Sequence, residues 1–231
     1  MIRRFIPAAL KRWLGESVYF WRYRHLLTGD AVWRGYAQDW ASPRRQIYPE
    51  LCRRFDIRSV FEFGCASGTN LLRIEREIPD RRFCFLGVDI SDSALSHAKN
   101  SVRSKSDFYQ TVAHSTIEVF LKHHKLVAID LAIYDRVLYI LTEAQVHKHL
   151  TAVSWAFRYV IVDDFFPVNH DGPQAWSTKD YVEIFRAHGF RLLEIARSEH
   201  KTSQSFHEHS AKRAIFIRHG DVAGVSESVN S

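Results

Sequence analysis

The feature that most constrains the fold is a change of rhythm after Ile57. From there to residue 219, short apolar runs alternate with segments whose apolar residues recur at helical spacing. Strands that alternate with helices favour an α/β fold, a mostly parallel sheet with helices on both faces. The last two apolar runs have no helical pattern between them, which predicts a C-terminal antiparallel strand pair.

Seven strands and five helices are expected in this part of the chain. The strands are expected at residues 59–63, 83–89, 107–112, 126–133, 159–165, 190–199 and 212–219. The helices are expected at residues 69–78, 92–102, 114–124, 142–157 and 177–189. A further helix is expected to begin near Ser42, which would be its N-cap, with Pro43 in the first helical position.

The chain divides into three expected regions. Residues 1–57 form a basic, aromatic and helical extension, residues 58–219 form the α/β domain, and residues 220–231 form a disordered polar tail. Residues 1–58 hold 12 lysines and arginines against 5 acids, so the basic character lies in the extension. The extension could cover an acceptor pocket, lie on an anionic membrane, or pack on the sheet as a solvated face.

The composition also bears on the cellular setting. No window approaches 18 uninterrupted apolar residues, and Lys11 and Arg12 interrupt the short apolar stretch near the N-terminus. We therefore expect a cytoplasmic protein, with peripheral contact at the inner membrane surface left open. The three cysteines have no metal-binding spacing and are expected to be free, mostly buried thiols.

The stretch VFEFGCASGTN, residues 60–70, carries the clearest chemical signal. Glu62 lies inside an expected buried strand, and Gly64 and Gly68 follow it directly. Glycines at the carboxyl end of a parallel strand let the backbone approach a ligand closely. Asp89 lies 21 residues beyond Gly68, at the end of the second strand, where a carboxylate accepts hydrogen bonds from a ribose diol.

Two nucleoside cofactors compete for this pattern. A nicotinamide dinucleotide needs the spacing G-x-G-x-x-G, which the glycines at 64 and 68 do not fit. The segment Glu62–Gly68 resembles the acidic-x-G-x-G-x-G motif of the class I S-adenosylmethionine-dependent methyltransferases, with Ala66 in place of the middle glycine. That cofactor carries an ammonium and a sulfonium, which an acid such as Glu62 suits.

The resemblance covers about residues 58–218 and implies a Rossmann-like, seven-stranded sheet and S-adenosylmethionine as cofactor. It implies that Glu62 lies near the cofactor's amino-acid part and that Asp89 binds the ribose. Ile90 would lie against the adenine. The loop beneath the cofactor would be formed by Gly64, Ala66 and Gly68.

Two further cofactor contacts are expected from the same resemblance. Many relatives place an acid after the third strand, opposite the adenine amino group, but this chain has Thr111–His114 there. A backbone group at Ala113 or the side chain of His114 could substitute for that acid. Tyr134, after the fourth strand, lies where relatives line the boundary between cofactor and acceptor.

Asp135 and His170 are the candidate catalytic residues. Asp135 could be a base or could orient the acceptor, or it could be a surface acid paired with Arg136. His170 follows the fifth strand, at the same edge of the sheet, and histidine has a suitable pKa for a base.

No metal is expected. Asp163 and Asp164 could suggest one, as in some catechol-type methyltransferases, but no motif places a third ligand. Six paired histidines are expected at the surface rather than at a zinc site: His123, His124, His147, His149, His207 and His209.

The favoured function is methyl transfer from S-adenosylmethionine to a small-molecule or lipid-linked acceptor. No N-P-P-Y-like motif follows the fourth strand, which favours oxygen over nitrogen as the methylated atom. The alternatives are an N-methyltransferase, a noncatalytic S-adenosylmethionine-binding partner module, and a nucleic-acid methyltransferase. Nucleic acid is the least favoured partner, and the oligomeric state is left open.

Overall fold

The computed structural model describes residue 35 and residues 38–167, 178–198 and 211–220. Several predictions therefore lie outside the described residues: the first amphipathic helix, the tail beyond residue 220, His170, His207 and His209.

The seven predicted strands form one sheet in the order β3-β2-β1-β4-β5-β7-β6. β7 runs antiparallel to both of its neighbours, β5 and β6, and the remaining neighbours are parallel. The predicted α/β fold with a closing antiparallel pair is confirmed. The strands are β1 (Ser59–Phe63), β2 (Cys84–Val88), β3 (Lys105–Tyr109), β4 (Ile129–Asp135), β5 (Phe157–Phe165), β6 (Phe190–Arg197) and β7 (Ala211–Arg218).

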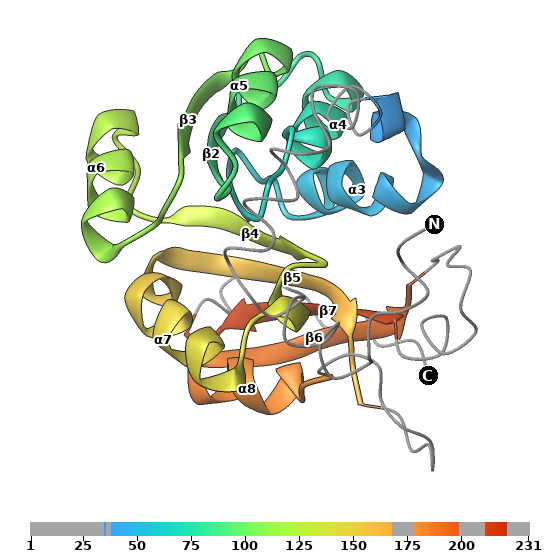
Figure 1. Cartoon of the computed structure of the whole chain (residues 1–231), viewed down its shortest axis with the longest axis vertical. Coiled ribbons are helices and arrows are strands. Elements are labelled where there is room, and N and C mark those ends of the chain that lie inside the picture. Colours follow the sequence, from blue (N-terminus) through green and yellow to red (C-terminus); the bar gives the residue numbers. More distant parts are fainter. Residues whose placement is uncertain (1–34, 36–37, 168–177, 199–210, 221–231) are drawn as a thin grey trace, which may run out of the picture.

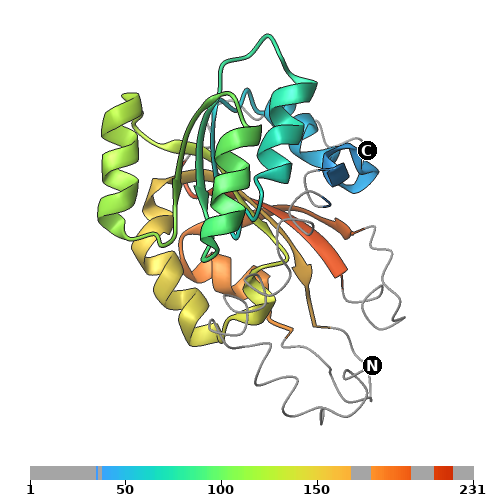
Figure 2. The ribbon, with the colours of Figure 1, turned by 45° about the horizontal axis from the view of Figure 1, so that its top comes forward.

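Helices cover both faces of the sheet. One face carries α3 (Ile47–Arg54), α4 (Thr69–Glu77) and α5 (Asp92–Ser101), and the other carries α6 (His114–His124), α7 (Glu143–Val153) and α8 (Tyr181–Ala187). Figure 1 shows the first three helices above the sheet and α7 and α8 below it. Figure 2 shows α6 beside α7. None of the helices in the described ranges is both long enough and apolar enough to cross a bilayer.

Two hydrophobic cores lie on the two faces, and β1 contributes to both. Val60 packs with the core under α3, α4 and α5, whereas Phe61 packs with the core under α6, α7 and α8. Successive side chains of a strand point to opposite faces. Glu62 therefore points toward α4, and Phe63 points toward α7.

One error in the predicted boundaries, at the start of β4, has a clear local cause. The strand was expected from residue 126, but it begins at Ile129. Lys125 ends α6 with a left-handed φ of 54°, and the amide of Leu126 donates to the carbonyl of Leu121. The chain thus turns back over the helix end before the sheet begins, and Val127 is fully exposed.

The expected start of the first described helix was only partly right. Pro43 follows Ser42 at the beginning of a helical turn, as predicted, but the turn is a short 3₁₀ helix over Pro43–Arg45. The serine side chain makes no capping hydrogen bond, and α3 begins at Ile47. This turn places Arg44 and Arg45 beside the carboxyl end of β4.

The three cysteines are free thiols, as predicted. Cys52 and Cys65 are buried, and Cys84 is half-buried. Burial raises the pKa of the Cys52 thiol to about 12, so this thiol stays protonated and acts as a small apolar side chain.

Candidate functional site

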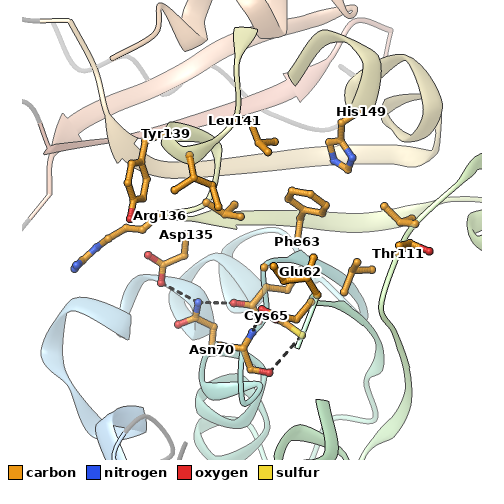
Figure 3. Close-up of a pocket in the computed structure, with 18 of the residues that line it drawn as sticks. Glu62, Phe63, Cys65, Asn70, Thr111, Asp135, Arg136, Tyr139, Leu141 and His149 are labelled. Carbon is orange, nitrogen blue, oxygen red and sulfur yellow. Dashed lines mark hydrogen bonds between the residues drawn. The ribbon is translucent and has the colours of Figure 1, made fainter. Parts of the chain in front are cut away.

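A pocket of about 580 Å³ lies at the carboxyl ends of β1, β2 and β4 (Figure 3). Its floor is the turn between β1 and α4, and one wall is the 3₁₀ helix Leu138–Ile140 with α7 behind it. Ligands bind at this edge of open α/β sheets. The predicted site residues that line the pocket are Glu62, Gly64, Ala66, Asp89, Ile90 and Asp135.

The turn after β1 depends on left-handed backbone conformations. Gly64 has a φ of 73°, and a Cβ there would lie 2.6 Å from Cγ2 of Val137, so both conformation and space require glycine. Gly68 has a φ of 71° and precedes α4, but it does not line the pocket. Ala66 adopts a φ of 47°, which costs an L-residue about 1–2 kcal/mol.

Asp89 fastens this turn to the end of β2. Its Oδ2 accepts the amide of Ala66 at 3.0 Å, and its Oδ1 accepts the amide of Ser91 at 2.9 Å. Burial raises the pKa of Asp89, and these two hydrogen bonds partly oppose the rise. A carboxylate offers about four acceptor positions, so about two remain for a diol in the pocket. Ser91 rather than Asp89 caps α5, because its hydroxyl accepts the amide of Ala94.

Glu62 is a buried acid with one unsatisfied oxygen. Its Oε1 accepts a hydrogen bond of 2.7 Å from Nδ2 of Asn70, whereas the buried Oε2 has no hydrogen-bond partner among the residues that the structure describes. Burial is the main cause that raises the pKa of Glu62 to about 8, and the negative charge of Asp135 adds to it. A buried acceptor without a partner is costly, and a cationic ligand group in the pocket would satisfy it.

Asp135 ends β4 in a very different environment. It accepts hydrogen bonds from Nδ2 of Asn70 at 2.9 Å and from Nη1 of Arg44 at 3.1 Å, and Nη1 of Arg45 lies 3.5 Å away. Although burial opposes it, the two guanidinium groups beside Asp135 hold the pKa of that carboxyl well below its usual range. The alternative of a surface acid is wrong, because Asp135 is largely buried. It hydrogen-bonds to Arg44 and Arg45, and the charge of Arg136 adds to their effect.

The expected adenine substitutes lie outside the pocket lining. Ala113 is the N-cap of α6, and the exposed His114 packs its ring 4.5 Å from that of Trp155. Gln110, Thr111 and Val112, the three residues before Ala113, line the pocket in their place. The wall after β3 therefore offers an amide, a hydroxyl and an apolar side chain, and no acid among its described lining residues.

His149 is a pocket residue that the sequence analysis missed. Its ring lies 4.2 Å from the ring of Phe63, and its Nε2 lies 3.0 Å from the hydroxyl of Tyr134 (Figure 3). Burial lowers the pKa of His149 to about 4, so the ring is neutral at pH 7. Tyr134, predicted to line the boundary between cofactor and acceptor, is instead buried in the core and does not line the pocket.

The surface assignment is therefore wrong for His149, and it is wrong for His124 as well. The His124 side chain is only 5% exposed, and its Nε2 lies 3.1 Å from a carboxylate oxygen of Asp107. This pair lies on α6 and β3, and neither residue lines the pocket.

The acid pair at the end of β5 does not form one site, because consecutive strand residues point to opposite faces. Asp163 accepts hydrogen bonds from Ser198 and Arg213. Asp164 accepts the amides of Leu138 and Tyr139 at 2.9 and 3.1 Å, and so fastens the 3₁₀ helix that walls the pocket. Burial raises the pKa of Asp164 to about 7.

Neither a family model nor a curated protein matches the chain. Solved structures do resemble it. The methyltransferase domain of bacterial CtHen1-C superposes with a TM-score of 0.55 at 15% identity, covering 76% of this chain and 96% of that domain. An O-methyltransferase family protein from Burkholderia thailandensis gives a TM-score of 0.56 at 11% identity, covering 77% of this chain and 56% of that protein.

The fold also occurs with another reaction. A protein described as a pericyclic reaction enzyme gives a TM-score of 0.50 at 12% identity, covering 70% of this chain and 43% of that protein. This chain thus spans less than two thirds of the length of the last two proteins. At such identities the likeness concerns architecture, and function has to be argued from the site. Its strand order and these superpositions together show that the chain has the class I methyltransferase fold.

Proposed function

We propose that the protein is an S-adenosylmethionine-dependent methyltransferase with a small-molecule or lipid-linked acceptor, and that oxygen is the methylated atom. The observation that carries the proposal is the unpartnered Oε2 of Glu62, buried in a pocket directly after a glycine turn. A neutral ligand leaves that acid without a charge partner. A ligand with an ammonium group supplies both the charge and the missing hydrogen bond.

The residues present fit this cofactor. Glu62 would hold the ammonium group, and the turn through Gly64 and Ala66 would lie beneath the cofactor's amino-acid part. Asp89 has acceptor positions left for the ribose diol. Ile90 and Val112 offer apolar surface for the adenine.

When bound, the cofactor supplies a methyl group already activated by its sulfonium. The chain's own contribution is then to hold the acceptor in line and to keep water out. Of the two roles kept open for Asp135, we assign it the orienting one, because a carboxylate held between Arg44 and Arg45 is a weak proton acceptor. His170 remains a candidate base.

Calorimetry with S-adenosylhomocysteine tests the cofactor assignment. We expect the wild-type protein to bind it, and we expect Asp89→Asn to weaken binding at least tenfold, because the ribose loses charge-assisted hydrogen bonds. Asp80→Asn is the matched control, since Asp80 lies exposed in the turn before β2. Absence of binding at millimolar ligand by the wild-type protein contradicts the proposal.

Product analysis separates the alternatives within the proposal. Incubation with methyl-labelled cofactor and a panel of phenols, carboxylic acids and amines should give a labelled product whose bond type reports oxygen or nitrogen. Binding of S-adenosylhomocysteine without transfer to any acceptor would favour the noncatalytic module. Liposome flotation of the full chain, compared with a variant lacking residues 1–14, tests the lipid-linked branch.

A further inference from the structure

The pocket has a strongly basic side beyond Asp135. Four guanidinium groups cluster there with two buried carboxylates and the half-exposed Asp39. The members of this cluster are Arg44, Arg45, Arg136, Arg213, Asp135, Asp163 and Asp39. Among the described residues the arginines thus outnumber the carboxylates of the cluster. Along the described pocket lining the four bases also outnumber the three acids even when Glu62 is ionised: the bases are Arg44, Arg45, Arg136 and Lys148, and the acids are Glu62, Asp89 and Asp135.

The arginines are held in different ways. Arg44 reaches Asp135 at 3.1 Å, Arg45 contacts Asp39 at 2.9 Å, and Arg213 contacts Asp163 at 2.8 Å. Each of these three guanidinium groups thereby donates to a carboxylate within the cluster and forms a structural ion pair with it.

Arg136 differs from these three in its backbone and in its position. Its φ is 52°, and its amide donates to the carbonyl of Asp163 at 2.8 Å, so a long side chain is held in a left-handed conformation. Strain of this kind gathers at ligand sites, where the surrounding structure fixes it. In Figure 3 the side chain extends beside Tyr139 and away from Glu62. Burial is the main cause that lowers the pKa of Arg136, and the positive charge of Arg44 adds to it, whereas the nearby carboxylates of Asp135 and Asp163 oppose it.

The proposed cofactor does not neutralise this excess of positive charge in the pocket. S-adenosylmethionine carries an ammonium and a sulfonium against a single carboxylate, so it adds positive charge to the pocket. No further carboxylate lines the described part of the pocket, which leaves the second ligand as the source of a balancing anion. An arginine fork suits a carboxylate or a phosphate, because it donates two parallel hydrogen bonds to either group.

Resting on the proposed function, we propose that the methyl acceptor is anionic and that its carboxylate or phosphate binds Arg136 beside Tyr139. Tyr139, Ile140 and Leu141 form the adjoining wall, so the body of the acceptor is apolar or aromatic. Arg136 is a specificity residue in this assignment: it recognises the acceptor's oxyanion and leaves the cofactor to Glu62 and Asp89.

Calorimetry in the presence of saturating S-adenosylhomocysteine tests the proposal. The probes are benzoate, phenyl phosphate and the neutral benzyl alcohol, at pH 7.5 and low salt. We expect at least one of the two anions to bind tenfold or more tightly than the alcohol, and the better anion identifies the source of the oxyanion. Arg136→Gln should remove this preference, whereas Arg136→Lys should retain part of it.

The controls separate this proposal from the function on which it rests. Arg136→Gln should bind S-adenosylhomocysteine within threefold of the wild-type affinity, and Arg58→Gln, at an exposed arginine, should leave every affinity unchanged. If wild-type protein binds S-adenosylhomocysteine but shows no preference for either anion, the anionic acceptor is wrong and the methyltransferase proposal stands. If it binds no S-adenosylhomocysteine, the methyltransferase proposal fails. Anion binding by the protein alone that is lost in Arg136→Gln would then support an anion site at Arg136, and absence of such binding would contradict it. The wild-type comparison of anion with alcohol decides the proposal even if the glutamine variant does not fold.

Discussion

The carboxyl ends of β1 and β4 carry two buried acids whose pKa values are shifted in opposite directions: the pKa of Glu62 is raised and that of Asp135 is lowered. Glu62 and Asp135 both accept a hydrogen bond from Nδ2 of Asn70, at 2.7 and 2.9 Å. Burial alone would raise the pKa of both groups. Two arginines donate hydrogen bonds to Asp135 and lower its pKa, whereas none of the described arginines donates a hydrogen bond to Glu62. The placement of the guanidinium groups therefore leaves Glu62 without a cationic partner among the described residues, whereas Asp135 is already neutralised by arginines.

Removal of Arg45 is expected to have the largest effect on this contrast. Arg45→Met removes one of the arginines that neutralise Asp135 and also the bond to Oδ1 of Asn70, so we expect the free energy of unfolding to fall by about 3 kcal/mol. Urea unfolding at pH 7 measures it. Arg58→Met, at a side chain that is 65% exposed, is the control and should change stability by less than about 0.5 kcal/mol. A similar loss in both variants would mean that Arg45 does not neutralise Asp135.

Replacement of Glu62 is expected to act on the ligand rather than on the fold. Glu62→Gln should weaken S-adenosylhomocysteine about 30- to 100-fold, because it removes one partner of a buried charge pair. Asp135→Asn should weaken it less than tenfold, because Asp135 is paired within the protein. Calorimetry with the exposed-acid variant Glu118→Gln as control measures both. Equal losses for Glu62→Gln and Asp135→Asn would end the division of roles between the two acids.

The two acids also predict opposite pH dependence of stability. The raised pKa of Glu62, about 8 in the folded protein against about 4.3 unfolded, favours the unfolded state increasingly as pH rises between these values. The lowered pKa of Asp135 contributes stability above the unfolded value of about 3.9 that is lost as pH falls below it.

Urea midpoints from pH 5 to pH 9 test this reading. Stability of the wild-type protein relative to Glu62→Gln should fall by more than about 1 kcal/mol across this range, since one unit of pKa corresponds to about 1.4 kcal/mol. A constant difference between the two proteins would place the pKa of Glu62 outside the range. Saturating S-adenosylhomocysteine should reduce the slope, because the ligand's ammonium favours the charged acid.

The smallest expected effects concern the non-glycine residues that adopt left-handed conformations at the two ends. Ala66→Gly should change stability by less than about 1 kcal/mol and S-adenosylhomocysteine affinity by less than threefold, because Ala66 acts through its amide. Arg136→Gly keeps the turn and loses the guanidinium, so it should lose the preference for benzoate or phenyl phosphate. A tenfold gain in cofactor affinity for Ala66→Gly would show that the Cβ of Ala66 obstructs the cofactor.

Local signals predicted the end of the pocket around Glu62 and Asp89, the proposed cofactor end, better than the end around Asp135 and Arg136, the proposed acceptor end. The acid, the glycine turn and Asp89 lie within 28 residues, and β1 and α6 were predicted with their observed limits. His149 also had a local signal: it lies three residues after Val146 and four before Val153, at the edge of the buried stripe of α7. The contact between Arg44 and Asp135 had no local signal in the sequence, because a contact across 91 residues depends on strand order and on the turn at Pro43.

That long separation in sequence bears on the order in which the two ends of the pocket form during folding. Glu62 and Asn70 are eight residues apart and can meet as soon as β1 and α4 form. Arg44 and Arg45 can meet Asp135 only when β4 lies beside β1, and the whole β2–α6 segment separates these two strands in the sequence. Closing so long a loop is entropically unfavourable and slow. We therefore expect the Asp135 end of the pocket to form later in folding than the Glu62 end. A chain shortened before Ile129 would retain Arg44 and Arg45 without the carboxylate that pairs with them.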